Sequence, residues 1–240
     1  MMISVCGSPE SGKSTLSLKL AQFFLKEKKQ VIVVQTDYYT PTFVTFFPEE
    51  EGSGSLGKLL SLPEITQEEI LRSICMIKGE ENLGVLSYAK EETRYHYPEY
   101  TKDRAAEVII QLKHMGDVVI IDCQTAFFED LFAITALEMA DRTLRVISAD
   151  LKGISYYKSC MPLLADSKFS PENAIKIVQD TKNTGLSGEA GDAILGADMI
   201  FPYTDELRRQ YLEEEILAPI GKKGKEYEKR IRQLAEGLRG

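Results

Sequence analysis

The chain has 240 residues, of which 43% are hydrophobic, and a formal net charge of −8. These values are typical of a globular protein with a sizeable core, and they argue against a surface built as a whole to bind nucleic acid. No apolar run is long enough to span a bilayer, and we expect no signal peptide, because the N-terminus lacks a basic region. Four widely spaced cysteines without a C-x-x-C pair indicate neither zinc nor disulfides, so we expect reduced thiols in the cytoplasm.

The segment GSPESGKST at residues 7–15 carries the strongest motif. It matches G-x-x-x-x-G-K-[ST], and an apolar stretch before it and an amphipathic pattern after it predict the required strand and helix. Backbone N–H groups of such a loop bind phosphates, the lysine lies near the β- and γ-phosphates, and the following hydroxyl ligates Mg²⁺. The residues expected to contact the nucleotide here are Gly7, Ser8, Pro9, Glu10, Ser11, Gly12, Lys13, Ser14 and Thr15.

Strand and helix patterns alternate along the rest of the chain. We predict strands at 31–34, 83–86, 117–122, 143–147, 174–178 and 199–201. Helices are predicted at 65–77, with Thr66 as N-cap, and at 103–115, 132–140, 154–164, 191–195 and 207–212. Residues 40–57 and 88–100 are expected to be loops. This alternation predicts an α/β fold with one domain over 1–240: a doubly wound, mostly parallel sheet of about seven or eight strands with helices on both faces.

Two aspartates fall at the carboxyl ends of predicted strands, where doubly wound sheets bind ligands. Asp122 follows a buried strand and is suited to a Mg²⁺-bound water, with a turn cap as the alternative. Asp37 could orient an attacking water or complete the metal shell, with an Asx-turn as the alternative. We therefore expect Lys13 and Asp37 as catalytic residues, and Ser14, Asp37 and Asp122 as Mg²⁺ ligands.

Four segments together resemble the ParA/MinD superfamily of P-loop ATPases. They are SVCGSPESGKSTLSLKLAQFFLKEKKQVIVVQTD, GDVVIIDCQTAFFED, ALEMADRTLRVISADLKGISYYKS and IFPYTDELRRQYLEEEIL, in the family's order. The resemblance implies ATP and Mg²⁺ as cofactors, Asp37 as the switch I acid and Asp122 as the Walker B acid. It also implies that Gln179 or Asp180 contacts the adenine, and that Pro202 and Tyr203 flank it.

Two positions depart from the family pattern. The signature lysine after the first loop glycine is replaced by Ser8, with Glu10 nearby, and the segment after Asp122 lacks the usual switch II glycine. Loss of a lysine that reaches the partner's nucleotide removes charge where charge develops in the transition state, so we expect slow hydrolysis. Non-standard loops of this kind are similar to the TadZ/CpaE-type pilus-assembly branch, as is the segment GSLGKLLSLPEITQEEILRS.

These observations predict a Mg-ATP-binding ATPase that acts as a nucleotide-dependent dimerising switch or localisation factor, as a homodimer with a protein partner in a localisation or assembly system. Two alternatives are a P-loop small-molecule kinase or ATP-dependent ligase, and an ATP-binding scaffold with negligible turnover. A GTPase is disfavoured because no N-K-x-D occurs near residue 180.

The C-terminal segment 222–240 is basic and amphipathic. Tyr227, Ile231, Leu234 and Leu238 fall on one helical face, which predicts packing on the sheet or on another subunit. Peripheral contact with the inner membrane through this face is the alternative. DNA contact through Arg208 and Arg209 is a weaker alternative to a solvated helix face.

Overall fold

An eight-stranded sheet forms the centre of the protein, with strand order β3-β4-β2-β5-β1-β6-β7-β8. The computed structural model describes residues 1–47 and 54–239. Every neighbouring pair is parallel except β3 and β4, which are antiparallel. The strands are β1 (Met2–Gly7), β2 (Val31–Gln35), β3 (Cys75–Met76), β4 (Leu83–Leu86), β5 (Val118–Asp122), β6 (Arg142–Ser148), β7 (Ala174–Gln179) and β8 (Met199–Phe201). The predicted α/β class and mostly parallel sheet are confirmed.

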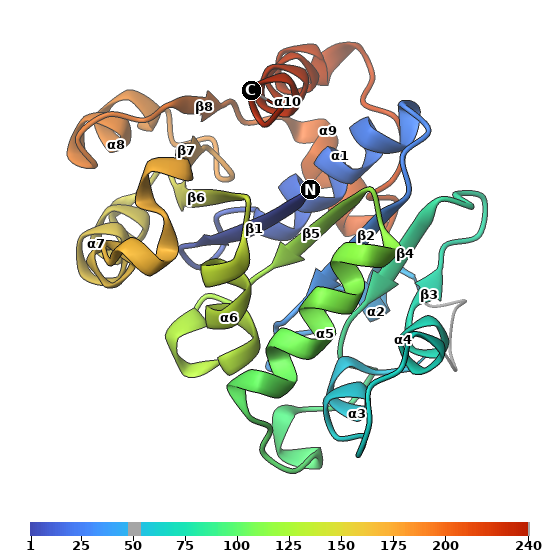
Figure 1. Cartoon of the computed structure of the whole chain (residues 1–240). Helices are drawn as coiled ribbons and strands as arrows, with labels where there is room; N and C mark the ends of the chain where they lie inside the picture. Colours follow the sequence, from blue (N-terminus) through green and yellow to red (C-terminus); the bar gives the residue numbers. More distant parts are fainter. Residues whose placement is uncertain (48–53, 240) are drawn as a thin grey trace.

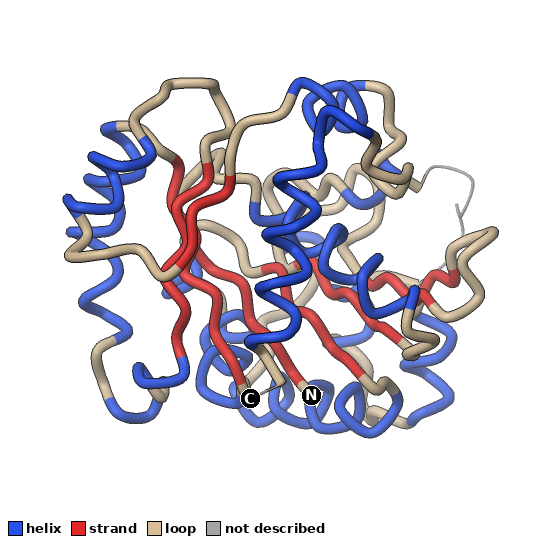
Figure 2. Tube along the Cα trace, turned by 90° about the horizontal axis from the view of Figure 1, so that it is seen from above, coloured by secondary structure: helices blue, strands red, loops and turns tan. Residues whose placement is uncertain are grey.

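Helices cover both faces of this sheet (Figures 1 and 2). Helices α1, α2, α9 and α10 contribute to the core on one face, and α3, α4, α5 and α6 to the core on the other. Helices α7 and α8 pack together beside β6 and β7. The helices are α1 (Lys13–Lys26), α2 (Phe43–Phe46), α3 (Leu56–Leu60), α4 (Gln67–Ser73), α5 (Lys102–Met115), α6 (Leu131–Met139), α7 (Leu151–Cys160), α8 (Ser187–Ala193), α9 (Asp205–Leu212) and α10 (Lys225–Gly237).

The central strands are apolar on both sides because both sides are covered. In β2, Val31 and Val33 belong to one core, while Ile32 and Val34 belong to the other. Successive side chains of a strand point to opposite faces, so a continuous β-branched run fills both cores at once. This explains why such runs predicted the strands well.

The predicted helix over 65–77 is too long. Thr66 caps the helix as expected, its Oγ1 accepting a hydrogen bond from the N–H of Glu69 at 3.2 Å, but α4 ends at Ser73. Ile74 is extended and packs over Gly84, and β3 follows it in antiparallel pairing with β4. The partner strand therefore overrides the local helical pattern.

The predicted loop over 40–57 is also partly wrong. Helix α2 lies within it, and α3 begins at Leu56, where the Ser55 hydroxyl accepts hydrogen bonds from two backbone N–H groups. Residues 48–53 of the predicted loop lie outside the described residues. Buried Phe43 and Phe46 anchor α2 in the core formed with α1.

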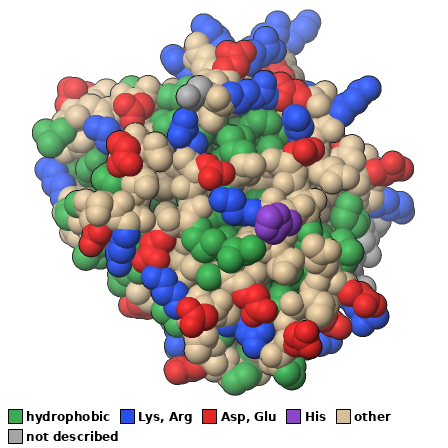
Figure 3. Space-filling view, viewed as in Figure 1, with side chains coloured by type: hydrophobic (Ala, Val, Ile, Leu, Met, Phe, Trp, Pro, Cys, Tyr) green, Lys and Arg blue, Asp and Glu red, His purple; other side chains and the backbone are tan. Residues whose placement is uncertain are grey.

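The C-terminal helix packs on the protein itself. Tyr227, Ile231, Leu234 and Leu238 are all buried, in the core shared with α1 and β8. The predicted packing of this apolar face on the sheet side is thus what the structure shows, and contact of 222–240 with a membrane stays a prediction. Lys and Arg side chains gather on the outer surface near α10 (Figure 3). No helix among the described residues is both long and apolar enough to cross a membrane.

Candidate nucleotide-binding site

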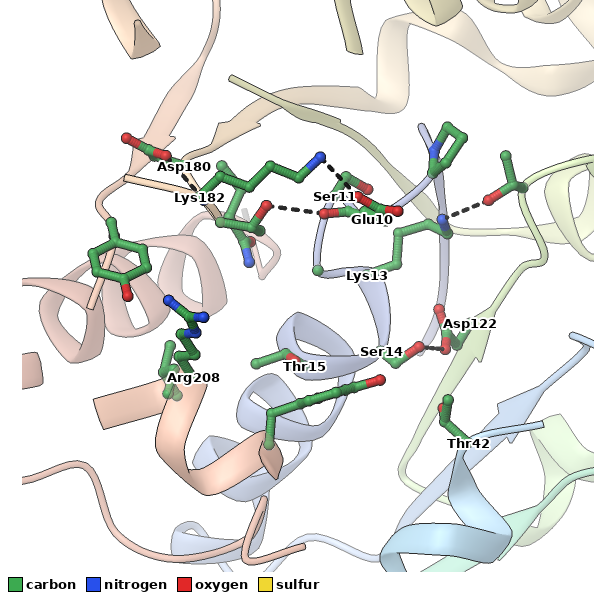
Figure 4. A pocket seen from close by; sticks show the side chains of 18 of the residues that line it. Glu10, Ser11, Lys13, Ser14, Thr15, Thr42, Asp122, Asp180, Lys182 and Arg208 are labelled. Atoms are coloured by element: carbon green, nitrogen blue, oxygen red, sulfur yellow. Dashed lines mark hydrogen bonds and ion pairs between the residues drawn. The ribbon is translucent and has the colours of Figure 1, made fainter. Parts of the chain in front are cut away.

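A cavity of about 680 Å³ opens at the carboxyl ends of the strands, above the phosphate loop. It brings together most of the residues that the sequence indicated: Pro9, Glu10, Ser11, Gly12, Lys13, Ser14, Thr15, Asp37, Asp122, Gln179, Asp180, Pro202 and Tyr203. Gly7 and Ser8 are not part of its lining. In Figure 4, Lys13, Ser14 and Asp122 lie together at one end of this cavity, and Asp180 and Arg208 lie across from them.

The loop conformation depends on two glycines. A Cβ on Gly7 would lie 1.8 Å from the carbonyl oxygen of Val146, because β6 passes directly behind the loop. Gly12 has φ 79°, in the left-handed region, and a Cβ there would meet the Gln179 amide at 2.2 Å. Only glycine fits both positions without displacing the backbone of β6 or the Gln179 side chain. This close packing directs the N-terminus of α1 into the cavity.

Lys13, Ser14 and Asp122 form the polar end of the cavity. Ser14 Oγ lies 2.5 Å from Asp122 Oδ2. Lys13 Nζ donates to the carbonyl oxygens of Gly7 at 3.3 Å and Ser8 at 3.0 Å. The other carboxylate oxygen, Asp122 Oδ1, is buried and accepts no hydrogen bond from any described residue. A buried acceptor without a donor is a suitable partner for a metal-bound water.

The electrostatics of this end couple the lysine to the aspartate. Burial raises the pKa of Asp122 to about 6, although the Lys13 ammonium and the Ser14 hydroxyl act in the opposite direction. Desolvation lowers the pKa of Lys13, and the charge of Asp122 opposes this shift. Each ionised group thus depends on the other, and added negative charge near Lys13 would favour its protonated form.

Gln35, which the sequence analysis did not single out, connects the polar end of the cavity to the segment after β2. Its Nε2 donates to Thr42 Oγ1 at 2.8 Å and lies 3.4 Å from Asp122 Oδ2, and its Oε1 accepts from the N–H groups of Thr42 and Phe43. Its position as the last residue of β2, at the carboxyl edge of the sheet, was the available signal. The start of α2 is therefore tied to the polar end of the cavity.

Asp37 lines the cavity, but its carboxylate is engaged by its own loop. Oδ1 accepts from the N–H groups of Tyr39 at 3.0 Å and Thr40 at 2.8 Å, and Oδ2 accepts from the Thr40 hydroxyl at 2.8 Å. This is the turn that we considered as the alternative to a catalytic role. A role for Asp37 in orienting water would require this turn to rearrange.

Ser8 points away from the cavity. It is fully buried, and its Oγ accepts a hydrogen bond from the backbone N–H of Ser148 at 3.0 Å and lies 3.3 Å from Ser148 Oγ. The residue at the signature-lysine position therefore fixes the loop to the end of β6. In this arrangement it cannot reach another subunit.

Lys182 supplies a positive charge beside the loop that the sequence did not reveal. Its Nζ lies 2.7 Å from Glu10 Oε2 and 3.0 Å from Asp150 Oδ2, at the N-terminus of α7. A hydrogen bond with Lys182 lowers the pKa of Glu10, and hydrogen bonds with both acids raise the pKa of Lys182. Thr181 Oγ1 also donates to the Glu10 carbonyl at 2.9 Å. The loop is thus attached to the segment that follows β7.

The two candidates for base contact have different surroundings. The Asp180 carboxylate accepts from the N–H groups of Lys182, Thr184 and Gly185, so it organises its own loop. The Gln179 amide packs against Gly12, and its Oε1 lies 3.5 Å from the Tyr227 hydroxyl. The remaining walls at this end are Pro202, Tyr203, Leu207, Arg208, Tyr211 and Leu212.

Thr125 links the phosphate loop to the segment after β5. Its hydroxyl accepts from Lys13 Nζ at 3.1 Å, and its carbonyl oxygen accepts from the Tyr156 hydroxyl on α7 at 2.6 Å. A change at the Lys13 ammonium can therefore reach α7 through two hydrogen bonds.

Comparison with known proteins agrees with this architecture. The family described as chromatin-associated protein KTI12 matches residues 1–51, which include the phosphate loop, α1 and β2. No curated protein matches the sequence significantly.

Several solved structures share the fold over the whole chain. A chain of the MinC:MinD cell division protein complex of Aquifex aeolicus is 16% identical with a TM-score of 0.74, covering 100% of this chain and 96% of that one. The ParA family ATPase of Chlorobium tepidum is 15% identical with a TM-score of 0.75, covering 98% and 97%. A Cyanothece McdA variant bound to ATP is 15% identical with a TM-score of 0.70, covering 99% and 96%. The chain thus has the fold of the MinD and ParA ATPases, as the sequence resemblance implied.

Proposed function

We propose that this protein binds Mg-ATP and acts as a nucleotide-dependent dimerising switch with slow hydrolysis. The observation that carries the proposal is the arrangement of Lys13, Ser14 and Asp122. A phosphate-loop lysine, a hydroxyl and a buried carboxylate meet at one end of the cavity, and one carboxylate oxygen has no hydrogen-bond partner in the described part of the chain. These groups fit Mg²⁺ bound together with nucleotide phosphates, which characteristically uses one or two protein oxygens plus phosphate and water.

The nucleotide would lie with its phosphates on the loop and its base between the segments after β7 and β8. Backbone N–H groups of the loop and the N-terminus of α1 would bind the phosphates, and Lys13 would exchange its carbonyl partners for phosphate oxygens. Ser14 and Asp122 would hold Mg²⁺, which neutralises charge on the β- and γ-phosphates. Adenine rather than guanine is supported by the absence of N-K-x-D near residue 180.

The base end of the cavity supports a stacking role for Tyr203 and an amide contact from Gln179. Asp180 is less suited to the base because its carboxylate already accepts three backbone N–H groups. The Tyr203 hydroxyl donates to Asp205 at 2.8 Å, which holds its ring beside Pro202 at the cavity wall. The ATP complex of McdA, which shares the fold, is consistent with ATP as the ligand here.

The same geometry supports slow turnover. Buried Ser8 offers no charge to a partner's nucleotide, and Asp37 is occupied by its turn. Both features remove contributions that a fast ATPase would need in the transition state. Within the same proposal, these two features favour a protein that uses its bound nucleotide to control assembly rather than one that hydrolyses ATP rapidly.

Two connections could carry the nucleotide state to the surface. Gln35 joins Asp122 to the start of α2, and Thr125 joins Lys13 to α7. Movement of Lys13 onto a phosphate would break its contact with Thr125 and allow the segment after β5 to rearrange, and phosphate-sensing switches work through such changes in a segment's order. We infer a homodimer across the loop face and a protein partner, as in the complex of MinD with MinC.

Light scattering tests the switch. We expect a mass near 27.0 kDa with Mg-ADP and twice that with Mg and a non-hydrolysable ATP analogue. Lys13→Ala should remain monomeric in both, because the phosphates lose their cation, whereas Lys29→Ala, on the exposed turn after α1, should behave as wild type.

Calorimetry on the same samples separates binding from switching. Heat of Mg-ATP binding together with an unchanged mass would refute the switch while retaining the nucleotide site. No heat from Mg-ATP would refute both.

A further inference from the structure

A second cavity, of about 460 Å³, lies away from the nucleotide-binding cavity and shares no lining residue with it. It opens between α7 and the 3-10 turn that follows it (Met161–Leu164) on one side and the end of α8 on the other. These two helices pack side by side at the β6–β7 part of the fold (Figure 1). Arg145, from the middle of β6, reaches this cavity from below.

Arg145 is a buried cation with no acid partner within residues 1–47 and 54–239. The residue is only 8% exposed, and none of the ion pairs of the described residues includes it. Nη2 donates to the Leu164 carbonyl at 3.0 Å, while Nε is buried and has no hydrogen-bond partner among the described residues. Burying a guanidinium with an unused N–H is costly unless an anion compensates for it.

The charges around the cavity leave it positive. Lys158 lines it, and Lys176 Nζ donates to the carbonyl of Leu195 at its edge. Asp198 is the nearby acid, and its carboxylate accepts from the backbone N–H of Lys176 at 2.7 Å. The described residues that line the cavity thus include two cations, Arg145 and Lys158, and no acid.

The walls are apolar. Tyr157, Met161, Pro162, Ile194 and Leu195 line them, so a strongly hydrated inorganic anion would lose its water without gaining contacts. An anion that carries an apolar body would satisfy both the guanidinium and the walls. The volume is within the range of sites that bind small organic molecules.

We propose that this cavity binds a small organic carboxylate with an aliphatic or aromatic body. Its carboxylate accepts from the terminal guanidinium N–H groups of Arg145, a charge-assisted contact that suits planar oxyanions. Its body packs between the 3-10 turn after α7 and the end of α8. Lys158, at the side of the cavity, adds long-range attraction.

The test uses 4-phenylbutyrate, its uncharged amide and inorganic phosphate as probes, with affinities from calorimetry or NMR titration of the full-length protein. We expect the carboxylate to bind at least tenfold more tightly than the amide or phosphate. Arg145→Met should weaken carboxylate binding at least tenfold, whereas Arg142→Gln, on the same strand, should change it less than twofold. Lys13→Ala should bind the carboxylate as wild type does, because the two cavities are separate.

A second variant keeps the proposal testable if Arg145→Met does not fold. Ala193→Phe fills the cavity without changing any charge, and it should also abolish carboxylate binding. No binding of the carboxylate to the wild type, equal binding of carboxylate and amide, or unchanged binding to Ala193→Phe would each overturn the proposal. In those cases Arg145 serves only to hold the Leu164 carbonyl.

Discussion

Replacing Asp122 with asparagine is expected to have two effects of opposite sign. The carboxylate is 2% exposed, and its Oδ1 has no donor among the described residues. Asp122→Asn removes the buried charge and should stabilise the nucleotide-free protein. The same change removes the oxygen suited to a metal-bound water, so the effect of Mg²⁺ on nucleotide binding should disappear.

The size of the first effect follows from burial. The pKa of Asp122 is raised from 3.8 to about 6, and at neutral pH this difference corresponds to about 3 kcal/mol of lost stability. The asparagine amide recovers hydrogen bonds imperfectly, at a cost of about 1 kcal/mol. We therefore expect a net gain of about 2 kcal/mol, or a rise in Tm of roughly 4–8 °C for a domain of this size.

The upward shift of the Asp122 pKa also predicts how the stability difference between wild type and variant depends on pH. Below about pH 4 the Asp122 carboxyl group is protonated in both the folded and the unfolded chain. Its burial should then not lower the stability of the wild type relative to that of Asp122→Asn. Between about pH 4 and 6 the unfolded carboxyl ionises while the folded one resists, and the advantage of the variant should grow. Above pH 6 it should stay constant.

Thermal unfolding measures both effects. Wild type and variant are compared in EDTA, with ATP in EDTA, and with ATP and Mg²⁺. Asp117→Asn is the matched control, because Asp117 is exposed just before β5, where its Oδ2 accepts from the N–H of Gln30 at 2.9 Å. It should leave the Mg²⁺ effect intact. A nucleotide-free Asp122→Asn protein less stable than wild type, or one that keeps the full Mg²⁺ effect, would refute the reasoning.

Two further predictions concern other buried groups. Ser8→Lys should not restore fast turnover, because it removes the acceptor of the Ser148 N–H and forces an ammonium into a fully buried position. Urea unfolding should show that the free energy of unfolding falls by at least about 2 kcal/mol. A stable variant with faster phosphate release would contradict this. Lys19 is nearly buried on α1, where desolvation lowers its pKa to about 8, so wild-type stability should gain up to about 3 kcal/mol relative to Lys19→Met as pH rises from 8 to 10.5. If the free energies of unfolding of the two proteins changed in parallel across that pH range, burial would not be lowering the pKa of Lys19.

Much of the fold could be predicted because the relevant patterns are local. The phosphate loop lies between an apolar strand and an amphipathic helix, and continuous β-branched runs such as 31–34 indicate strands that are covered on both faces. Helix α5 matches its predicted span to within one residue for the same reason, since its apolar positions repeat along the chain. Local sequence also placed Asp122 at the carboxyl edge of the sheet, where Ser14 meets it.

The tertiary structure decided which partner each group has. The sequence could not show that Ser8 faces β6, that Gln35 joins Asp122 to α2, or that Lys182 reaches Glu10 across 172 positions of chain. The apolar face of α10 was visible in the sequence, but only the fold shows that α1 and β8 cover it. Periodicity specifies which side of an element is apolar, whereas sheet order and long-range packing specify what lies against that side.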